Sequence, residues 1–208
     1  MHSEDLIRPA KYGRKDVLQK QSPVPAAPGV YLWWFNQIPG GIDTTECIRN
    51  GSLALLYAGI SPSAPPQNGK PPSRQNLRTR IRTHYAGNAE GSTLRKTLGC
   101  LLADELDIEL RRVGSGGRRT FVAGESVLSS WMEEHAFVSW LERPEPWLAE
   151  ADLIRHVDLP LNLDQNSHNH FYMTLKAARA AAVARANALP ILPNPGVGGR
   201  GASGLGRL

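Results

Sequence analysis

The pattern of apolar and polar positions divides the chain into short strands and amphipathic helices. The run from Val30 to Phe35 is apolar and rich in β-branched and aromatic residues, as is typical of a strand. A second run of this kind ends at Ile60, after a turn rich in Gly, Pro and Asp at residues 38–44. We expect these two strands to pair as an antiparallel hairpin.

Helical periodicity follows a proline-rich loop. Residues 61–75 contain five prolines and no apolar period, which indicates a loop. Asn76 can cap a helix whose apolar positions recur every four residues, at Leu77, Ile81 and Tyr85. A second helix is expected from its N-cap, Ser92, to Leu106.

The remaining elements complete a mixed fold. The turn Gly-Ser-Gly-Gly at 114–117 predicts a hairpin. A short helix (about 127–134), a strand (136–142), a helix (147–157) and a long Ala-rich helix (about 171–188) are expected after it. This order predicts an α/β (α+β) fold with a small antiparallel β-sheet flanked by helices and an additional C-terminal helix. We divide the chain into an irregular N-terminal lead-in (1–27), a domain (28–190) and a Gly-rich flexible tail (191–208).

Composition narrows the class of protein. The 208 residues are 41% hydrophobic and 21% charged, as in an ordinary globular domain, and no apolar run is long enough for a membrane span. Residues 1–21 lack a signal-peptide pattern, so a cytoplasmic location is expected. Cys47 and Cys100 lack metal-binding spacing, which argues against a zinc site or a disulfide framework.

Positive charge is concentrated in one part of the chain. The net charge is +5, and between residues 70 and 96 Glu90 is the single acid among seven basic residues, Lys70, Arg74, Arg78, Arg80, Arg82, Arg95 and Lys96. Such a basic region favours a phosphate-rich partner. An exposed, solvated face explains the charge equally well.

Glu150 is a carboxylate on an apolar helical face. Four apolar residues lie on the same face at helical spacing, Trp147, Leu153, Ile154 and Val157. An ionised carboxylate in such surroundings costs several kcal/mol unless a positive charge lies beside it. The partner can be a buried arginine or a metal ion, and the spacing alone leaves both open.

The chemistry-bearing residues fall in four short motifs along the chain. Tyr31 and Tyr57 stand in the two strands, and Arg80 and His84 are four apart on one helix. The motifs, in chain order, are Gly29-Val30-Tyr31, Tyr57-Ala58-Gly59, Arg80-x-x-x-His84, and Glu150-x-x-Leu153-Ile154 followed by Pro160 and Asn162. This order resembles the GIY-YIG nuclease family, and the resemblance covers roughly residues 28–165. Val30 and Ala58 replace the family's Ile, and the 61–75 loop is longer than the family's usual link from the second strand to the helix.

The resemblance implies a GIY-YIG-like fold and phosphodiester hydrolysis. It implies that Glu150 holds one divalent ion, Mg²⁺ or Mn²⁺, that Arg80 binds the scissile phosphate, and that Tyr31 is the general base. A nearby cation is expected to lower the pKa of Tyr31. Tyr57, His84 and Asn162 are then expected to orient water, phosphate or backbone.

The resulting hypothesis is a metal-dependent endonuclease acting on DNA, with RNA left open. Arg78, Arg82, Arg95 and Lys96 are candidate nucleic-acid contacts. One alternative is a nucleic-acid-binding protein that keeps the fold with little or no cleavage activity. Another is a structural domain in which Glu150 and Arg80 form a buried ion pair.

Overall fold

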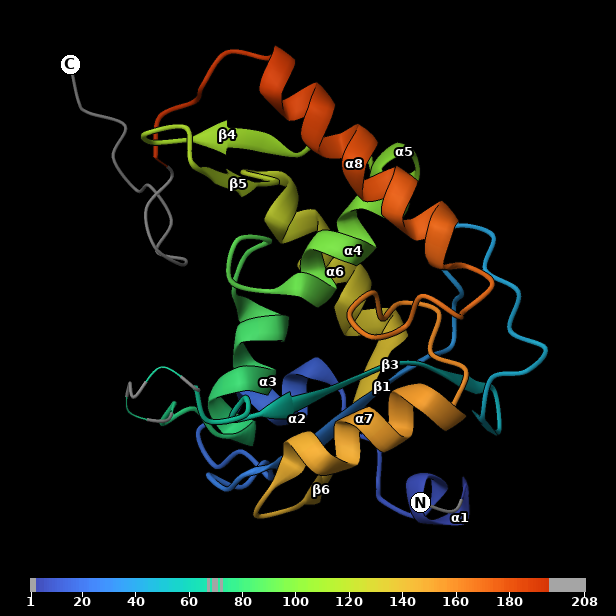
Figure 1. Cartoon of the computed structure of the whole chain (residues 1–208). Coiled ribbons are helices and arrows are strands. Elements are labelled where there is room, and N and C mark those ends of the chain that lie inside the picture. The colour runs from blue at the N-terminus through green and yellow to red at the C-terminus, as the bar shows by residue number, and fades with distance from the viewer. Residues whose placement is uncertain (1–2, 67, 69–70, 72, 195–208) are drawn as a thin grey trace.

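The computed structural model describes residues 3–66, 68, 71 and 73–194 (Figure 1). The elements, in chain order, are α1 (Ser3–Ile7), α2 (Arg14–Leu18), β1 (Gly29–Phe35), β2 (Arg49–Asn50), β3 (Leu53–Ser61), α3 (Leu77–Ala86), α4 (Thr93–Leu101), α5 (Ala103–Leu106), β4 (Arg111–Val113), β5 (Arg118–Thr120), α6 (Gly124–His135), β6 (Ala136–Glu142), α7 (Pro146–His156) and α8 (Tyr172–Ala188). The predicted α+β class, with a small antiparallel sheet, flanking helices and a C-terminal helix, is confirmed.

The main sheet has the order β2-β3-β1-β6, and every neighbouring pair is antiparallel. The expected pairing of the first two long strands is confirmed, with Tyr31 opposite Gly59 and Trp33 opposite Tyr57. The hairpin predicted around residues 114–117 also forms, from β4 and β5. Among the described residues, no helix is both long enough and apolar enough to cross a membrane.

Both faces of the sheet are covered, which explains why β1 is apolar at every position. Alternate side chains of β1 point to opposite faces, as the period of a strand requires. Tyr31, Trp33 and Phe35 join a core formed with α3, α4, α6 and α8, and the intervening residues join a second core with α1 and α7. The sheet is therefore a rigid support between two helical layers.

Three predicted elements differ in the structure. The segment expected to be an irregular lead-in contains α1 and α2, and its Leu6, Val17 and Val24 are buried. The helix expected from 92 to 106 divides at Leu102 into α4 and α5. α6 begins at Gly124, three residues earlier than expected. Of the predicted tail, residues 195–208 lie outside the described residues.

The arginines of the β4–β5 hairpin hold the end of α8. Arg112 donates from Nε to the carbonyl of Ala186 (3.1 Å) and from Nη2 to that of Leu189 (2.9 Å). Arg119 donates to the side-chain oxygen of Asn187 (3.0 Å). Cations are favoured at a helix C-terminus, where carbonyl groups lack intrahelical partners. These arginines therefore stabilise the C-terminal helix.

Candidate functional site

Tyr31 is the centre of a group of polar side chains inside the molecule. It lies in β1, is 1% exposed, and points to the face of the sheet covered by α3. Its hydroxyl oxygen is 3.4 Å from Nε of Arg80 and 3.0 Å from Nε2 of His84. The spacing of four residues places Arg80 and His84 on one face of α3. Both side chains therefore reach one phenol.

The glycines of the two tripeptide motifs are required by close approach. A Cβ at Gly29 would lie 2.4 Å from the carbonyl oxygen of Leu141 in β6 and 2.7 Å from the Leu77 side chain. A Cβ at Gly59 would lie 2.5 Å from the Tyr31 hydroxyl and 2.7 Å from its ring. Gly59 thus leaves the space that the Tyr31 ring fills.

Replacing Gly59 by alanine should displace the Tyr31 hydroxyl. We expect Gly59→Ala to lower the rate of any reaction that uses Tyr31 by about 10²-fold, because a shift of about 1 Å at a reacting group has effects of this size. Gly117→Ala is the matched control, since a Cβ there meets nothing within 4 Å. Kinetics of both variants would test this, and equal activity would show that the Tyr31 position is not critical.

His84 links Tyr31 to the start of α4. It is fully buried, and its Nδ1 lies 2.7 Å from Oγ of Ser92, the N-cap of α4. Burial lowers the pKa of His84 well below its usual value, and the positive charges of Arg80 and Arg95 lower it further. His84 is therefore a neutral imidazole near pH 7, within a chain of hydrogen-bonding groups from Tyr31 to Ser92. The sequence indicates Ser92 as a helix cap but carries no signal for its contact with His84.

Arg80 lowers the pKa of Tyr31 as predicted, but the net shift of this pKa is upward. Burial raises the pKa of the Tyr31 phenol above its usual value, and the nearby Arg80 guanidinium only partly opposes this effect. Arg80 lies where the sequence predicted, but desolvation of a phenol enclosed in the core outweighs one cation. Tyr31 is therefore protonated near neutral pH.

Tyr57 and Arg80 complete this part of the site. Tyr57 is 7% exposed, and its ring lies edge-on to that of His84, with centroids 6.3 Å apart. Burial also raises the pKa of Tyr57. Arg80 is half-buried, and its Nη1 donates to the carbonyl of Gly91 (3.0 Å), immediately before α4. This bond and the contact with Tyr31 fix the guanidinium at the rim of the site.

Glu150 extends from α7, and its charge acts on both tyrosines. It is half-buried, and no hydrogen bond or ion pair joins it to the described residues. The buried Glu150–Arg80 ion pair considered from the sequence is therefore absent among these residues. Burial raises the pKa of Glu150 to about 7, and the carboxylate of Asp164 raises it as well. No motif or periodicity indicates Asp164, which lies in the loop after Asn162.

The donor set at Glu150 fits a divalent ion that keeps most of its water. Its carboxylate is a hard oxygen ligand whose charge is not compensated by a described cation. No group of three or more His, Cys, Asp or Glu residues in the described part of the chain could hold a metal by itself. A single carboxylate suits Mg²⁺, which is commonly bound through one or two carboxylates with water and phosphate oxygens.

The raised pKa of Glu150 predicts an unusual pH dependence of stability. The folded chain binds more protons than the unfolded chain between the ordinary pKa of 4.5 and about 7, so the free energy of unfolding falls as the pH rises through this range. Without divalent metal, we expect Glu150→Gln to be more stable than wild type by about 1 kcal/mol near pH 8, because solvent screens this half-buried carboxyl. The two should be similar near pH 5. Thermal melts in chelator test this, and a less stable variant near pH 8 would contradict it.

Asn162 stabilises the open edge of β3. Its Oδ1 accepts a hydrogen bond from the amide of Ala58 (3.0 Å), and its Nδ2 donates to the carbonyl of Ala58 (2.8 Å). Ala58 lies between Tyr57 and Gly59 in the second motif. The amide of Asn162 therefore fixes the backbone that carries Tyr57 and faces Tyr31.

Of the four candidate nucleic-acid contacts, three are arginines whose side chains bind groups within this chain. Arg95 is fully buried and forms an ion pair with Glu125 (2.8 Å), so its expected role in binding nucleic acid is corrected to a structural one. Arg78 and Arg82 are exposed but donate to backbone carbonyls of the N-terminal segment. They lie two residues from Arg80 on either side, which is almost the opposite face of α3. Lys96 is half-buried in α4 with no ion pair to the described residues.

Comparison with protein families matches residues 29–181 to the family described as the GIY-YIG catalytic domain. The match includes both tyrosine motifs, the α3 residues Arg80 and His84, and Glu150, and it extends into α8. Comparisons with curated proteins and with solved structures give no match.

Proposed function

This chain belongs to the GIY-YIG family, and we propose that it is a divalent-metal-dependent endonuclease that hydrolyses phosphodiester bonds in DNA. A nuclease-type function follows from the family. Residues 28–190 act as one nuclease domain in this proposal. The observation that carries it is the convergence of Arg80 and His84 on the Tyr31 hydroxyl, beside a Glu150 carboxylate that has no cationic partner in the described chain.

Glu150 is the residue that would hold the metal. One bound ion, Mg²⁺ or Mn²⁺, would relieve negative charge on the phosphate and on the leaving 3′ oxygen. The half-buried position of Glu150 suits this role, because the charge it carries above about pH 7 is stabilised when a cation arrives.

Arg80 binds the scissile phosphate in this mechanism. Its Nε and Nη1 are directed to Tyr31 and Gly91, which orients the planar guanidinium while leaving donors available. The phosphate gains negative charge in the transition state. A donor fixed in this way therefore stabilises the transition state more than the ground state. Arg80 also connects the phosphate to the general base, because it touches the Tyr31 oxygen.

Tyr31 removes the proton from the attacking water, and His84 receives the proton that Tyr31 gives up. The two pKa directions favour this relay over a preformed phenolate, since burial keeps Tyr31 protonated and His84 neutral. Arg80 donates to the Tyr31 oxygen, so the phenol can direct its own proton toward Nε2 of His84. His84 Nδ1–H can then donate to Ser92.

Tyr57 and Asn162 are positioning residues in this proposal. Tyr57 lies beside the ring of His84, and a side-chain hydrogen bond between Tyr57 and Tyr31 lowers the pKa of Tyr31. Asn162 acts through the backbone of Ala58. Lys96 is retained as a phosphate contact, because it carries a positive charge near the start of α4, where Arg80 is anchored.

Cleavage of supercoiled plasmid, linear duplex, branched DNA and RNA tests the proposal. Wild type with Mg²⁺ or Mn²⁺ should cut at least one DNA, and chelator should stop the reaction. Binding that falls steeply with salt, without cleavage under any of these conditions, would favour the alternative of a nucleic-acid-binding protein with the same fold. Preferential cleavage of RNA would change the substrate and leave the proposed chemistry in place.

A further inference from the structure

We propose that Trp147 is a stacking platform for an unpaired base beside the scissile phosphate, with Arg143 and Lys96 holding the backbone on either side. This inference rests on the proposed nuclease function and names its substrate class. The substrate is nucleic acid with at least one unpaired nucleotide next to the cut, such as a flap, gap, loop or single strand.

Trp147 differs from the other four tryptophans in how it is packed. Trp33, Trp34 and Trp131 are 0%, 0% and 6% exposed, and Trp140 stacks on Tyr12 with ring centroids 4.9 Å apart. Trp147 is half-buried, belongs to neither apolar core, and forms no ring contact with the described residues. The fold therefore does not account for this large aromatic side chain, which remains accessible.

The position of Trp147 places it at the site. It precedes Glu150 by three residues in α7, so the two share a helical face with Cβ atoms about 5–6 Å apart. Side chains on a helix lean toward its N-terminus, so the Glu150 side chain leans toward Trp147 along the same face of α7. A nucleotide adjoining a phosphate at Glu150 would therefore meet Trp147.

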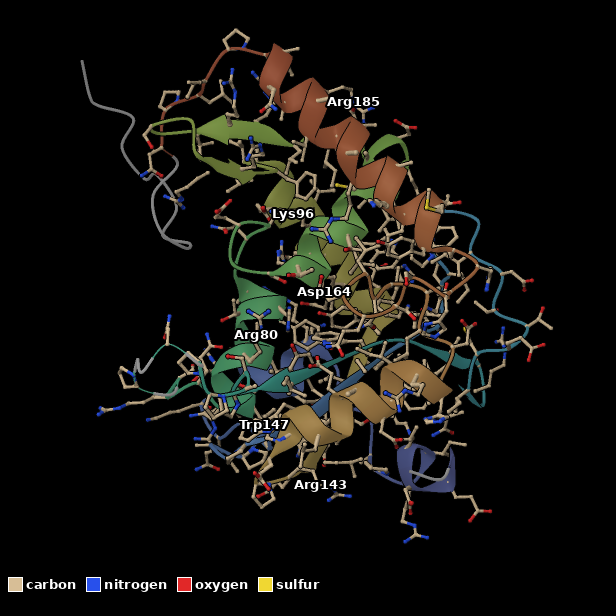
Figure 2. The ribbon with its side chains drawn as sticks, in the orientation of Figure 1. Arg80, Lys96, Arg143, Trp147, Asp164 and Arg185 are labelled. Atoms are coloured by element: carbon tan, nitrogen blue, oxygen red, sulfur yellow. The ribbon has the colours of Figure 1, made fainter. Side chains whose placement is uncertain are left out.

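Basic residues lie on both sides of this position. In Figure 2 the labelled side chains of Lys96, Arg80, Trp147 and Arg143 follow one another down the same view of the molecule. The backbone amide of Arg143 donates to Pro28 (3.1 Å), at the start of β1, and its guanidinium donates only to the adjacent carbonyl of Glu142 among the described residues. The Lys96 ammonium has no acidic partner within that part of the chain.

The neighbouring charges select nucleic acid over a protein as the partner. Leu148 is 64% exposed beside Trp147, so an apolar protein surface is the competing occupant. The carboxylates of Glu150 and Asp164 act on each other, and Asp164 is labelled between Lys96 and Arg80 in Figure 2. Arginine and lysine beside such a pair of carboxylates match a phosphodiester backbone with a cation at one phosphate.

Stacking on Trp147 requires an unpaired base. In a duplex both faces of each base are covered by neighbouring base pairs, and a protein side chain reaches only their edges. An indole can stack on a base only when that base is terminal, flipped or single-stranded. An aromatic residue placed beside a reacting phosphate is therefore suited to nucleic acid that is not continuously paired at the cut.

The inference is tested by measuring equilibrium binding, in the presence of chelator, to three DNAs. These are an intact duplex, the same duplex with a single-stranded flap, and a single strand. Trp147→Ala should weaken binding of the flap and the single strand by about 5- to 100-fold and change duplex binding little. Trp147→Phe should restore most of the loss. Lys96→Ala and Arg143→Ala should each weaken binding of all three DNAs and reduce the salt slope by about 0.7–0.9. Thermal melts establish that each variant is folded.

Two exposed residues of α7 provide matched controls. Leu148→Ala removes the adjacent apolar side chain, and Arg155→Ala removes a positive charge at the other end of the helix. The inference is overturned if Trp147→Ala binds the flap as wild type does, or if it loses equal affinity for the duplex and the flap. Cleavage by wild type would still support the nuclease proposal in that case. A loss on Leu148→Ala as large as that on Trp147→Ala points to an apolar partner and also overturns it. Absence of both binding and cleavage in wild type removes both proposals together.

Discussion

Glu150→Gln is expected to lower the rate of metal-dependent cleavage by at least about 10³-fold. The substitution keeps the size and polarity of the side chain but removes the charge that would bind the divalent ion, and such an ion supplies several kcal/mol of transition-state stabilisation. Cleavage measured over a range of Mg²⁺ and Mn²⁺ concentrations tests this expectation. High metal concentration should restore little activity, because the lost carboxylate is the proposed direct ligand.

The control for this experiment is Glu145→Gln, which removes an exposed carboxylate at the N-cap of the same helix. It should cut at nearly the wild-type rate. Calorimetric titration with Mn²⁺ separates loss of metal from loss of fold, since the Glu150 variant should bind the ion weakly while melting normally in chelator. Wild-type metal affinity in the Glu150 variant would contradict the assignment of this residue as the ligand.

The local elements could be predicted from the sequence because their signals lie within a few residues. Asn76 and Ser92 were recognised as helix caps, and in the structure each accepts a hydrogen bond from the third residue of its helix. The hairpin at 114–117 was similarly specified by its glycines. The helix break at Leu102 is not predictable from local signals, because residues 100–106 contain neither proline nor glycine.

The pairing of charges could not be predicted, because it depends on contacts far apart in the chain. Arg95 counted as part of a basic region, yet its partner Glu125 lies 30 residues later, on α6. The proximity of Arg80 to Tyr31 was expected from the motifs, whereas the pKa of Tyr31 depends on how completely the core encloses it. Sequence order thus indicates most members of the candidate site, whereas burial determines the direction in which their pKa values shift.

Tyr31→Phe is expected to reduce cleavage by about 10³-fold, because it removes the hydroxyl proposed to take the proton from water and leaves the ring in place. His84→Gln should have an effect of similar size, since it removes the group proposed to receive the Tyr31 proton. Tyr85→Phe is the matched control. Its hydroxyl donates to the carbonyl of Ala136 (2.7 Å), so this change should lower stability by about 1 kcal/mol and leave cleavage nearly unchanged.

The double variant Tyr31→Phe with His84→Gln distinguishes a relay from two separate roles. Residues that act as one unit are non-additive, so the double variant should be only slightly slower than either single variant. The wild-type rate at saturating metal should also be nearly constant from about pH 7 to 9, because the lowered pKa of His84 and the raised pKa of Tyr31 keep both groups neutral there. A preformed phenolate would instead make the rate rise about tenfold per pH unit. The relay would be excluded if the rate losses of the two single variants multiply in the double variant and the wild-type rate rises with pH. Tyr31 would then act as a base independently of His84.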